Sequence, residues 1–373
     1  MNENITLKID NREISVPKGT TILEAARELG IDIPTLCYMN LKDLCIKNAP
    51  ASCRICVVEV DGRKNLAPSC ATRCENGMNV HTNTMRVLNA RRTVLELMLS
   101  DHPSDCLVCA KSGSCELQAV AIKLGIREIP FQGTQTEYKV DLSPSIRRDA
   151  TKCIYCRRCE MMCNDIQTVG ALGAVNRGFD SVVMPAFDQA LQDSECTFCG
   201  QCVAVCPVGA LTELDHTNRL IKDLANPDKT VIVQTAPAVR AALGEEFGLP
   251  AGTSVTGKMV AALRKLGFAK VFDTDFAADL TIMEEGTELL GRLDAALKGG
   301  KAVLPMITSC SPGWIKHVEH QFPEQLDHLS SCKSPHTMMG AVLKSYYAEK
   351  IDVSPKDIFV VSVMPCTAKK YEI

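Results

Sequence analysis

Two stretches of the chain, "KCIYCRRCEMMCN" at residues 152–164 and "ECTFCGQCVAVCP" at residues 195–207, have the strongest structural signal. Each contains four cysteines spaced C-x2-C-x2-C-x3-C, and the second copy follows the first after 43 residues. The whole chain has 373 residues and twenty cysteines. Cysteines repeated at such regular intervals predict metal ligands rather than scattered thiols.

The repeated spacing predicts two 4Fe–4S clusters. Three closely spaced thiolates hold three irons of one cubane, and the fourth cysteine of each run reaches the other cluster. The expected ligand sets are Cys153, Cys156, Cys159 and Cys206 for one cluster, and Cys196, Cys199, Cys202 and Cys163 for the other. Two zinc sites are the alternative, because C-x2-C also suits tetrahedral zinc. The regular spacing, with Pro207 after the last cysteine, favours iron–sulfur clusters.

Composition narrows the class of protein. A net charge of −3 offers no basic surface on the scale that nucleic acid requires. The sequence has no run of eighteen apolar residues, so we expect no membrane span. The start "MNENITLKID" resembles no secretion signal, which predicts a cytoplasmic protein whose thiols stay reduced. These features agree with metal-bound cysteines rather than disulfides.

The N-terminal residues predict a small β-grasp module. Residues 5–16 alternate apolar and polar side chains about Asp10-Asn11, which is typical of a β-hairpin. Residues 20–30, "TTILEAARELG", predict a helix in which Thr21 and Glu24 form a capping box and Gly30 marks the end.

A 2Fe–2S cluster is expected in this module. The expected ligands are Cys37, Cys53, Cys56 and Cys70. The plant-type spacing is C-x4-C-x2-C, and the longer interval between Cys37 and Cys53 is acceptable because the cost of loop closure grows slowly with length. Cys45 lies within that loop and is an alternative to Cys37, whereas Cys74 is expected to be an ordinary thiol.

A third 4Fe–4S cluster is predicted after an amphipathic helix over residues 86–99. His102 precedes three cysteines in C-x2-C-x5-C spacing, namely Cys106, Cys109 and Cys115. Three thiolates leave one iron without a protein ligand, and an imidazole can supply it. The alternative is that His102 is an ordinary hydrogen-bonded histidine.

After residue 222 the pattern changes to strands alternating with helices, which predicts a largely parallel sheet. Apolar strands are expected at the start of residues 230–248, at the end of residues 258–276, and at the start of residues 301–322 and 357–370. Ligands bind beyond the carboxyl ends of such strands. The expected binding edge holds Ala236-Pro237, Thr308 to Ser311, and Met364 to Cys366.

The motifs in this region resemble those of a known family. "TSCSPGW" (308–314) and "MPCTAKK" (364–370) are similar to the first two active-site signatures of FeFe-hydrogenases, and "DTDFAADLTIMEEGTELLGRL" (273–293) is similar to the segment before the first signature. The order of the iron–sulfur modules is shared with the large iron–sulfur subunit of complex I. Among hydrogenases the chain resembles the catalytic subunit of NAD(P)-linked, multimeric, electron-bifurcating enzymes.

The resemblance implies an H-cluster, in which a 4Fe–4S cube is joined through a cysteine to a two-iron unit. It implies that Cys366 binds the cube and that Lys369 donates to a cyanide ligand. Ala236, Pro237 and Ser311, at the expected binding edge, are the candidate cofactor-binding residues. The familiar first signature is Thr-Ser-Cys-Cys-Pro, so Ser311 replaces a ligand here. Cys310 is therefore either a cube ligand or the proton relay. The implied proton path runs through Glu288, Ser330 and Glu285 to Cys310.

In the family a third signature with two further cysteines lies downstream of the second, but this chain has only seven residues after Cys366. Cys332 is a poor substitute for either of those cysteines. A fragment, a truncated product or a catalytic half on another polypeptide each fits this pattern. We therefore expect residues 1–373 alone not to turn over hydrogen, and residues 222–373 to be unstable or dependent on a partner.

Together these patterns predict an α+β multidomain protein. The expected domains are a 2Fe–2S module (1–82), a histidine-ligated 4Fe–4S module (83–125), a two-cluster ferredoxin module (140–217) and part of a hydrogenase domain (222–373). The resemblance implies an oxidoreductase that relays electrons to an H-cluster for reversible H2 oxidation. Implied partners are a flavin-bearing NADH-oxidising subunit, a small thioredoxin-like ferredoxin subunit and free ferredoxin. A relay subunit without its own catalysis, as in complex I, is the alternative.

Overall fold

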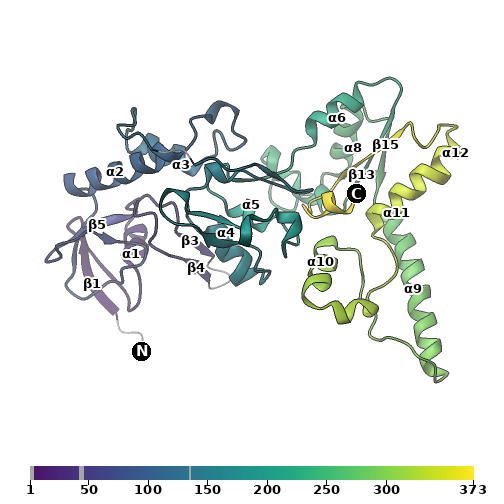
Figure 1. Cartoon of the computed structure of the whole chain (residues 1–373), viewed down its shortest axis with the longest axis horizontal. Helices are drawn as coiled ribbons and strands as arrows, with labels where there is room; N and C mark the ends of the chain where they lie inside the picture. The colour runs from purple at the N-terminus through teal and green to yellow at the C-terminus, as the bar shows by residue number, and fades with distance from the viewer. Residues whose placement is uncertain (1–3, 42–45, 134–135) are drawn as a thin grey trace. The chain divides into compact units, whose positions relative to one another are not determined.

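The computed structural model describes residues 4–41, 46–133 and 136–373. The chain divides into two compact units. The first unit comprises Met1–Ser143, Arg147–Ser194 and Gln201–Thr212, and the second comprises Pro144–Ile146, Glu195–Gly200 and Glu213–Ile373. Figure 1 shows both along the chain, from purple at the N-terminus to yellow at the C-terminus.

The first unit begins with the predicted hairpin. Strands β1 (Asn4–Ile9) and β2 (Arg12–Pro17) pair antiparallel, with Ile9 opposite Arg12. The two loop residues, Asp10 and Asn11, both have positive φ, which is the geometry of the two-residue turn that matches strand twist. The hairpin prediction is confirmed.

A five-stranded sheet in the order β2-β1-β7-β5-β6 extends this hairpin. Its other strands are β5 (Val57–Val60), β6 (Ala67–Pro68) and β7 (Asn79–His81), and β7 runs parallel to β1. Helix α1 (Ile22–Glu28) starts at the predicted capping box of Thr21 and Glu24. Its apolar side chains pack with those of the sheet into one core, as a β-grasp module requires.

Helix α2 (Met85–Asp101) is joined to this module by a buried arginine. The Arg91 Nε and Nη2 atoms donate to the Val57 carbonyl at 3.1 and 2.7 Å. The rest of the first unit consists of short elements: β3 (Met39–Leu41), β4 (Ile46–Asn48), α3 (Glu116–Lys123), β8 (Asp141–Leu142), α4 (Arg158–Met161), β10 (Gly173–Val175), β11 (Val182–Met184) and α5 (Gln201–Val205). Strands β9 (Ile146–Arg148) and β12 (Leu211–Glu213) include residues of both units.

The second unit contains a parallel sheet in the order β14-β13-β15, as predicted. The strands are β13 (Thr230–Thr235), β14 (Lys270–Asp273) and β15 (Ile358–Val363), and α9 is the long green helix of Figure 1. The helices are α6 (Thr217–Leu224), α7 (Val239–Ala242), α8 (Thr256–Lys265), α9 (Asp275–Leu297), α10 (Pro312–Gln321), α11 (Pro335–Val342), α12 (Ala348–Lys350) and α13 (Lys369–Glu372).

The strand predicted at the start of residues 301–322 is wrong. Residues 301–306 form no strand, and Ile307 makes only a single parallel bridge to Leu329. Pro305 lies inside this apolar run and has no backbone N–H to donate, so the run cannot form a regular ladder. Cys310 therefore follows an irregular segment rather than a strand of the sheet.

A buried polar network joins the sheet to α11 and α13. His336, on α11, is 4% exposed, and its Nε2 lies 2.6 Å from the Ser362 Oγ on β15. Its Nδ1 lies 3.0 Å from the Glu372 Oε2, and that oxygen accepts from the Lys369 Nζ at 2.8 Å. The Gln234 side chain on β13 donates to the His336 carbonyl and to Ser362, at 3.0 and 3.1 Å. The network fixes the C-terminal helix against the sheet.

Glu372 makes this network sensitive to pH. Partial burial raises the pKa of Glu372, but hydrogen bonds from His336, Lys369 and Ser334 lower it by more, to about 2. The ionised carboxylate therefore contributes stability above its ordinary pKa of 4.5, and this contribution is lost as the pH falls toward 2.

The substitution Glu372→Gln is expected to destabilise the second unit by about 2 kcal/mol at pH 7, since charged hydrogen bonds are removed. The difference from the wild type should shrink as the pH falls from 4.5 toward 2, as followed by thermal unfolding. Glu349→Gln, at an exposed position on α12, serves as the control. A Glu372→Gln deficit that is equal at pH 7 and pH 3 would contradict this role of the carboxylate.

Candidate metal centres

Four buried cysteines meet at the loops of the β-grasp module. Cys37, Cys53, Cys56 and Cys70 are each at most 4% exposed. Their thiols contact one another, because Cys37 is hydrogen-bonded to Cys53 and Cys70, and Cys56 is hydrogen-bonded to Cys70. The structure thus brings together the four residues expected to bind the 2Fe–2S cluster.

The contacts among these thiols shift their pKa values in opposite directions. Hydrogen bonds from Cys53 and Cys70 lower the pKa of Cys37, and a hydrogen bond from Cys70 lowers the pKa of Cys56 to about 6. The same contact with Cys37 raises the pKa of Cys53 and of Cys70. The thiolates of Cys37 and Cys56 are thus stabilised by neighbouring thiols, and iron ions would compensate their negative charge.

The module has two further cysteines, Cys45 and Cys74, which are not among the four expected ligands. Cys45, the alternative to Cys37, lies outside the described residues. Cys74 packs in the hydrophobic core with α1, and burial raises its pKa to about 11. A buried thiol with a raised pKa is a poor nucleophile, which agrees with the expectation that Cys74 is an ordinary thiol rather than a ligand.

His102 and three cysteines line a common cavity in the first unit. His102 ends α2, Cys106 and Cys109 bracket a short 3-10 turn, and Cys115 is the N-cap of α3. The lining residues include His102, Cys106, Cys109 and Cys115. Burial lowers the pKa of His102, so the neutral imidazole that metals bind is favoured.

The His102 ring has a buried nitrogen without a protein partner. Its Nδ1 is inaccessible to solvent and forms no hydrogen bond with any described residue. Buried polar atoms normally have a partner, so this one fits a ligand bound from outside the chain. The backbone at Gly209 lies close to this cavity: a Cβ at this position would lie 2.5 Å from the Cys109 Sγ, so a larger residue would displace that sulfur.

Cysteines from both copies of the repeat line a second cavity. Its walls include Cys153, Cys156 and Cys159 from the first copy, and Cys206 from the end of the second. This is the exchange of the fourth cysteine that the spacing predicts. Among the described residues, no three His, Cys, Asp or Glu side chains converge so as to hold a single metal ion. Cys153, Cys156, Cys159 and Cys206 instead line the wall of a shared cavity.

The two copies share a backbone geometry that turns cysteines inward. Tyr155 and Phe198, two residues after the first cysteine of each copy, have φ of 52° and 56°. The N–H groups of both residues donate to the sulfur of that first cysteine at 3.4 Å. Arg157 and Gly200 also have positive φ, so both copies use the same turns.

The second set of ferredoxin-type cysteines is divided between the units. Cys163 and Cys202 belong to the first unit, and Cys163 lies in a π-helical turn, Met162–Ile166. Cys196 and Cys199 belong to the second unit. Their shared cluster remains a prediction.

The two hydrogenase-like signatures meet in the second unit. The Lys369 Nζ donates to the backbone carbonyl of Cys310 at 2.7 Å. The Ala236 N–H, after β13, donates to the Val363 carbonyl at 3.0 Å, which places Ala236-Pro237 beside the strand that leads to Cys366. Cys310 is exposed and Cys366 is partly buried. The lysine is thus held at the first signature by backbone contact.

Ser311 has a local structural role. It is the N-cap of α10, where its Oγ accepts from the Trp314 N–H at 3.4 Å, and Pro312 is the first helical residue. Ser-Pro is a favourable start for a helix. The structure therefore accounts for Ser311 as a helix cap, a role that the sequence comparison with the family signature did not reveal.

Two residues of the implied proton path are in contact. The Ser330 hydroxyl donates to the Glu288 Oε2 at 3.0 Å, and Ser331 donates to the same oxygen from its N–H and hydroxyl. The other Glu288 oxygen accepts from Arg292 at 2.6 Å. Partial burial raises the pKa of Glu288, but these hydrogen bonds lower it overall. Glu285 lies half-buried one turn earlier on α9.

Several charged residues near these sites were not identified from the sequence. Arg91, Lys152, Arg158 and His336 are buried, and Glu372 pairs with His336. Lys152 and Arg158 directly precede cysteines of the repeat, which is the one signal that could have singled them out. None of the helices described here is long and apolar enough to cross a membrane.

Comparison with protein families divides the chain into four matched segments. Residues 229–373 match the iron-only hydrogenase large subunit, C-terminal domain. Residues 2–85 match a 2Fe–2S iron–sulfur cluster binding domain, and residues 91–130 match the NADH-ubiquinone oxidoreductase-G iron–sulfur binding region. Residues 143–212 match the ferredoxin-like domain of NADH-quinone oxidoreductase subunit 3.

Two curated proteins are similar to nearly the whole chain. The NADP-reducing hydrogenase subunit HndD of Solidesulfovibrio fructosivorans is 63% identical over 99% of this chain and 63% of its own length. Iron hydrogenase 1 of Clostridium pasteurianum is 39% identical over 98% of this chain and 62% of its own length. The chain therefore spans a little over three fifths of these relatives.

One solved structure is similar in fold and sequence. A chain of the NAD+-reducing NiFe-hydrogenase in its H2-reduced state is 31% identical, with a TM-score of 0.51. The match covers 56% of this chain and 87% of that one. Residues 229–373 belong to the iron-only hydrogenase large subunit, C-terminal domain family, and the chain as a whole is similar to FeFe-hydrogenases over nearly its full length.

Proposed function

We propose that this chain relays electrons between NAD(P)H- or ferredoxin-linked partners and an H-cluster, for reversible H2 oxidation and proton reduction. The observation that supports the relay most directly is the cavity lined by Cys153, Cys156, Cys159 and Cys206. Its cysteines come from both copies of a ferredoxin-type repeat, which is the ligand exchange of two-cluster ferredoxins. Iron–sulfur clusters supply one-electron redox chemistry when bound.

The proposed cofactors are one 2Fe–2S and three 4Fe–4S clusters. The 2Fe–2S domain spans 1–82, the histidine-ligated domain spans 83–125, and the two-cluster domain spans 140–217. The family matches to residues 2–85, 91–130 and 143–212 support this division. The orphaned Nδ1 of His102 and the four contacting thiols of the β-grasp module support the ligand sets.

Residues 222–373 are proposed to contribute part of an H-cluster site. Cys310 and Cys366 are the candidate cube ligands, and Lys369 is the candidate donor to a cyanide ligand, supported by its contact with the Cys310 carbonyl. From residue 213 onward the chain has only Cys310, Cys332 and Cys366, fewer than the cube and its bridge to the two-iron unit require. These residues therefore do not make up a whole H-cluster site.

The acidic residues of α9 are proposed to move protons to this site. Glu288 and Ser330 are hydrogen-bonded, and Glu285 is on the same helix toward its N-terminus. The donors that lower the pKa of Glu288 keep its carboxylate ionised, so its proposed place in the path rests on its contact with Ser330. Cys310 is the proposed end of the path if it is not a cube ligand.

Partner subunits are part of the proposal. HndD is named as a subunit of an NADP-reducing hydrogenase, which supports a flavin-bearing, NAD(P)H-oxidising subunit and a small thioredoxin-like ferredoxin subunit as partners. Free ferredoxin is a further proposed partner. A relay without its own catalysis is the second candidate, supported by the matches of residues 91–130 and 143–212 to NADH-ubiquinone and NADH-quinone oxidoreductase domains. Hydrogen evolution driven by methyl viologen in the assembled protein distinguishes the two.

Anaerobically reconstituted protein is expected to bind about 14 irons in the four relay clusters, with one 2Fe–2S and three 4Fe–4S signals. Iron analysis and electron paramagnetic resonance of the dithionite-reduced protein measure this. Protein that binds chiefly zinc, after reconstitution with both metals present, would contradict the electron-relay function.

Replacing His102 with Ala is expected to remove or convert one 4Fe–4S signal and to leave the other two in place, because only one cubane loses a ligand. His102→Cys should restore a four-iron cluster. His81→Ala, which alters a partly exposed histidine paired with Asp61, is the matched control. Spectra of His102→Ala identical to those of the wild type would show that His102 is not a ligand.

A further inference from the structure

We infer that Arg158 is a positioning residue for electron transfer, which joins three metal-binding loops and keeps a positive charge where they meet. The inference rests on the proposed ligand sets. It concerns a residue that is not itself a ligand and lies wholly within the first unit.

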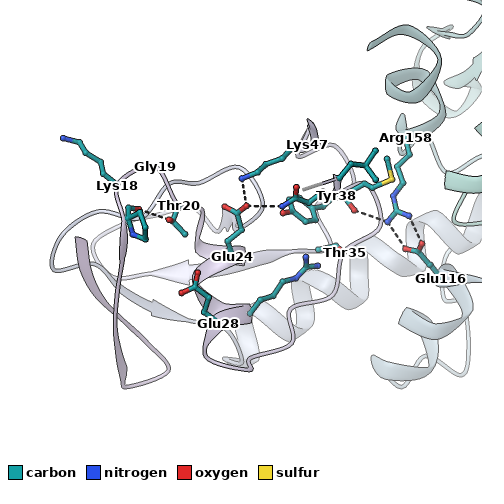
Figure 2. Close-up of a pocket in the computed structure, with 15 residues that line it drawn as sticks. Lys18, Gly19, Thr20, Glu24, Glu28, Thr35, Tyr38, Lys47, Glu116 and Arg158 are labelled. Atoms are coloured by element: carbon teal, nitrogen blue, oxygen red, sulfur yellow. Dashed lines mark hydrogen bonds and ion pairs between the residues drawn. The ribbon is translucent and has the colours of Figure 1, made fainter. Parts of the chain in front are cut away.

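The Arg158 side chain contacts two loops besides its own. Arg158 directly precedes Cys159 and is 7% exposed. Its Nη2 donates to the backbone carbonyl of Tyr38 at 3.1 Å, and Tyr38 directly follows Cys37. Both Nη atoms bind the Glu116 carboxylate, at 2.6 and 2.8 Å, and Glu116 directly follows Cys115 (Figure 2). Arg158, itself next to a proposed ligand, thus contacts the neighbours of ligands from two further proposed clusters.

Further hydrogen bonds hold the same loops together. The Glu116 N–H donates to the Pro207 carbonyl at 3.0 Å, and Pro207 directly follows Cys206. The Asn48 amide, 7% exposed, donates to the Cys37 carbonyl at 2.6 Å and to the Cys156 carbonyl at 3.4 Å. The loops that carry Cys37 and Cys115 are therefore both tied to the set that contains Cys156, Cys159 and Cys206.

A second buried cation makes a similar but smaller connection. Lys152 directly precedes Cys153, and its Nζ pairs with the Asp105 Oδ2 at 2.7 Å, next to Cys106. Lys152 therefore joins two loops, whereas Arg158 joins three. A planar guanidinium holds its donors in a fixed fork, so it can bind a carboxylate with two parallel hydrogen bonds and still donate to a carbonyl.

The charge of Arg158 also affects the reduction potentials of the proposed clusters. Arg158 interacts electrostatically with the thiols of Cys156 and Cys37. Reduction adds one negative charge to a cluster, so a buried cation favours the reduced state, and the Glu116 carboxylate opposes it. Because an arginine stays protonated, this charge is constant across the working pH. Removing Arg158 or Glu116 should therefore shift the same clusters in opposite directions.

The test is a redox titration of the reconstituted full chain, followed by electron paramagnetic resonance. In Arg158→Gln we expect the reduced-to-oxidised ratio at a fixed potential to fall roughly tenfold for the 2Fe–2S cluster and the Cys153-containing cubane. A tenfold change corresponds to 59 mV for a one-electron couple. Glu116→Gln should raise the ratio, and Arg158→Lys, which keeps the charge, should shift it less than Arg158→Gln.

Arg63→Gln is the matched control, because it removes an exposed arginine that is paired with Glu75. Unchanged ratios in both variants, or shifts of the same sign in Arg158→Gln and Glu116→Gln, would overturn the inference. If Arg158→Gln fails to retain its clusters, the reduced-to-oxidised ratio in Glu116→Gln still tests the inference: a raised ratio supports it, and an unchanged or lowered ratio overturns it. A wild-type chain that assembles no clusters would instead refute the proposed function, and the inference would fail with it.

Discussion

The structure of the first unit depends on one constraint of the proposed clusters: each cluster needs four ligands, and the ferredoxin-type set takes its fourth from a distant part of the sequence. Cys206, at the end of the second copy of the repeat, lines the same cavity as Cys153, Cys156 and Cys159, as this constraint requires. Left-handed residues such as Tyr155 and Arg157 allow the short loop to turn its sulfurs inward. These backbone conformations are strained, and they place the cysteine side chains so that they face the cavity.

The same constraint explains where charge is buried. Several loops that carry the proposed ligands are held by hydrogen bonds and ion pairs of buried cations. Arg91 fixes α2 to β5, Lys152 and Arg158 join ligand loops, and each of the last two is paired with a carboxylate. Breaking such a pair leaves an uncompensated buried charge, which is why these contacts specify the arrangement. In the second unit His336 and Glu372 hold Lys369 near Cys310 in a comparable way.

Sequence reasoning worked where the information is local. The Asp10-Asn11 turn and the Thr21–Glu24 capping box follow from neighbouring residues, and the cysteine spacing indicates which residues share a cluster. It failed at residues 301–307, where apolar composition suggested a strand but Pro305 and the lack of a partner prevented one. The role of Arg158 was out of reach, because Tyr38 and Glu116 are distant in sequence and only the fold brings them together.

The central claim is that the fourth ligand of each ferredoxin-type cubane comes from the other copy of the repeat. The most direct measurement is Mössbauer and paramagnetic resonance spectroscopy of a Cys206→Ala variant beside Cys202→Ala. The account predicts that Cys206→Ala perturbs the cubane that Cys153→Ala perturbs, while Cys202→Ala affects the other one. If Cys206→Ala and Cys202→Ala instead altered the same cubane, each copy of the repeat would hold its own cluster and the account would be wrong.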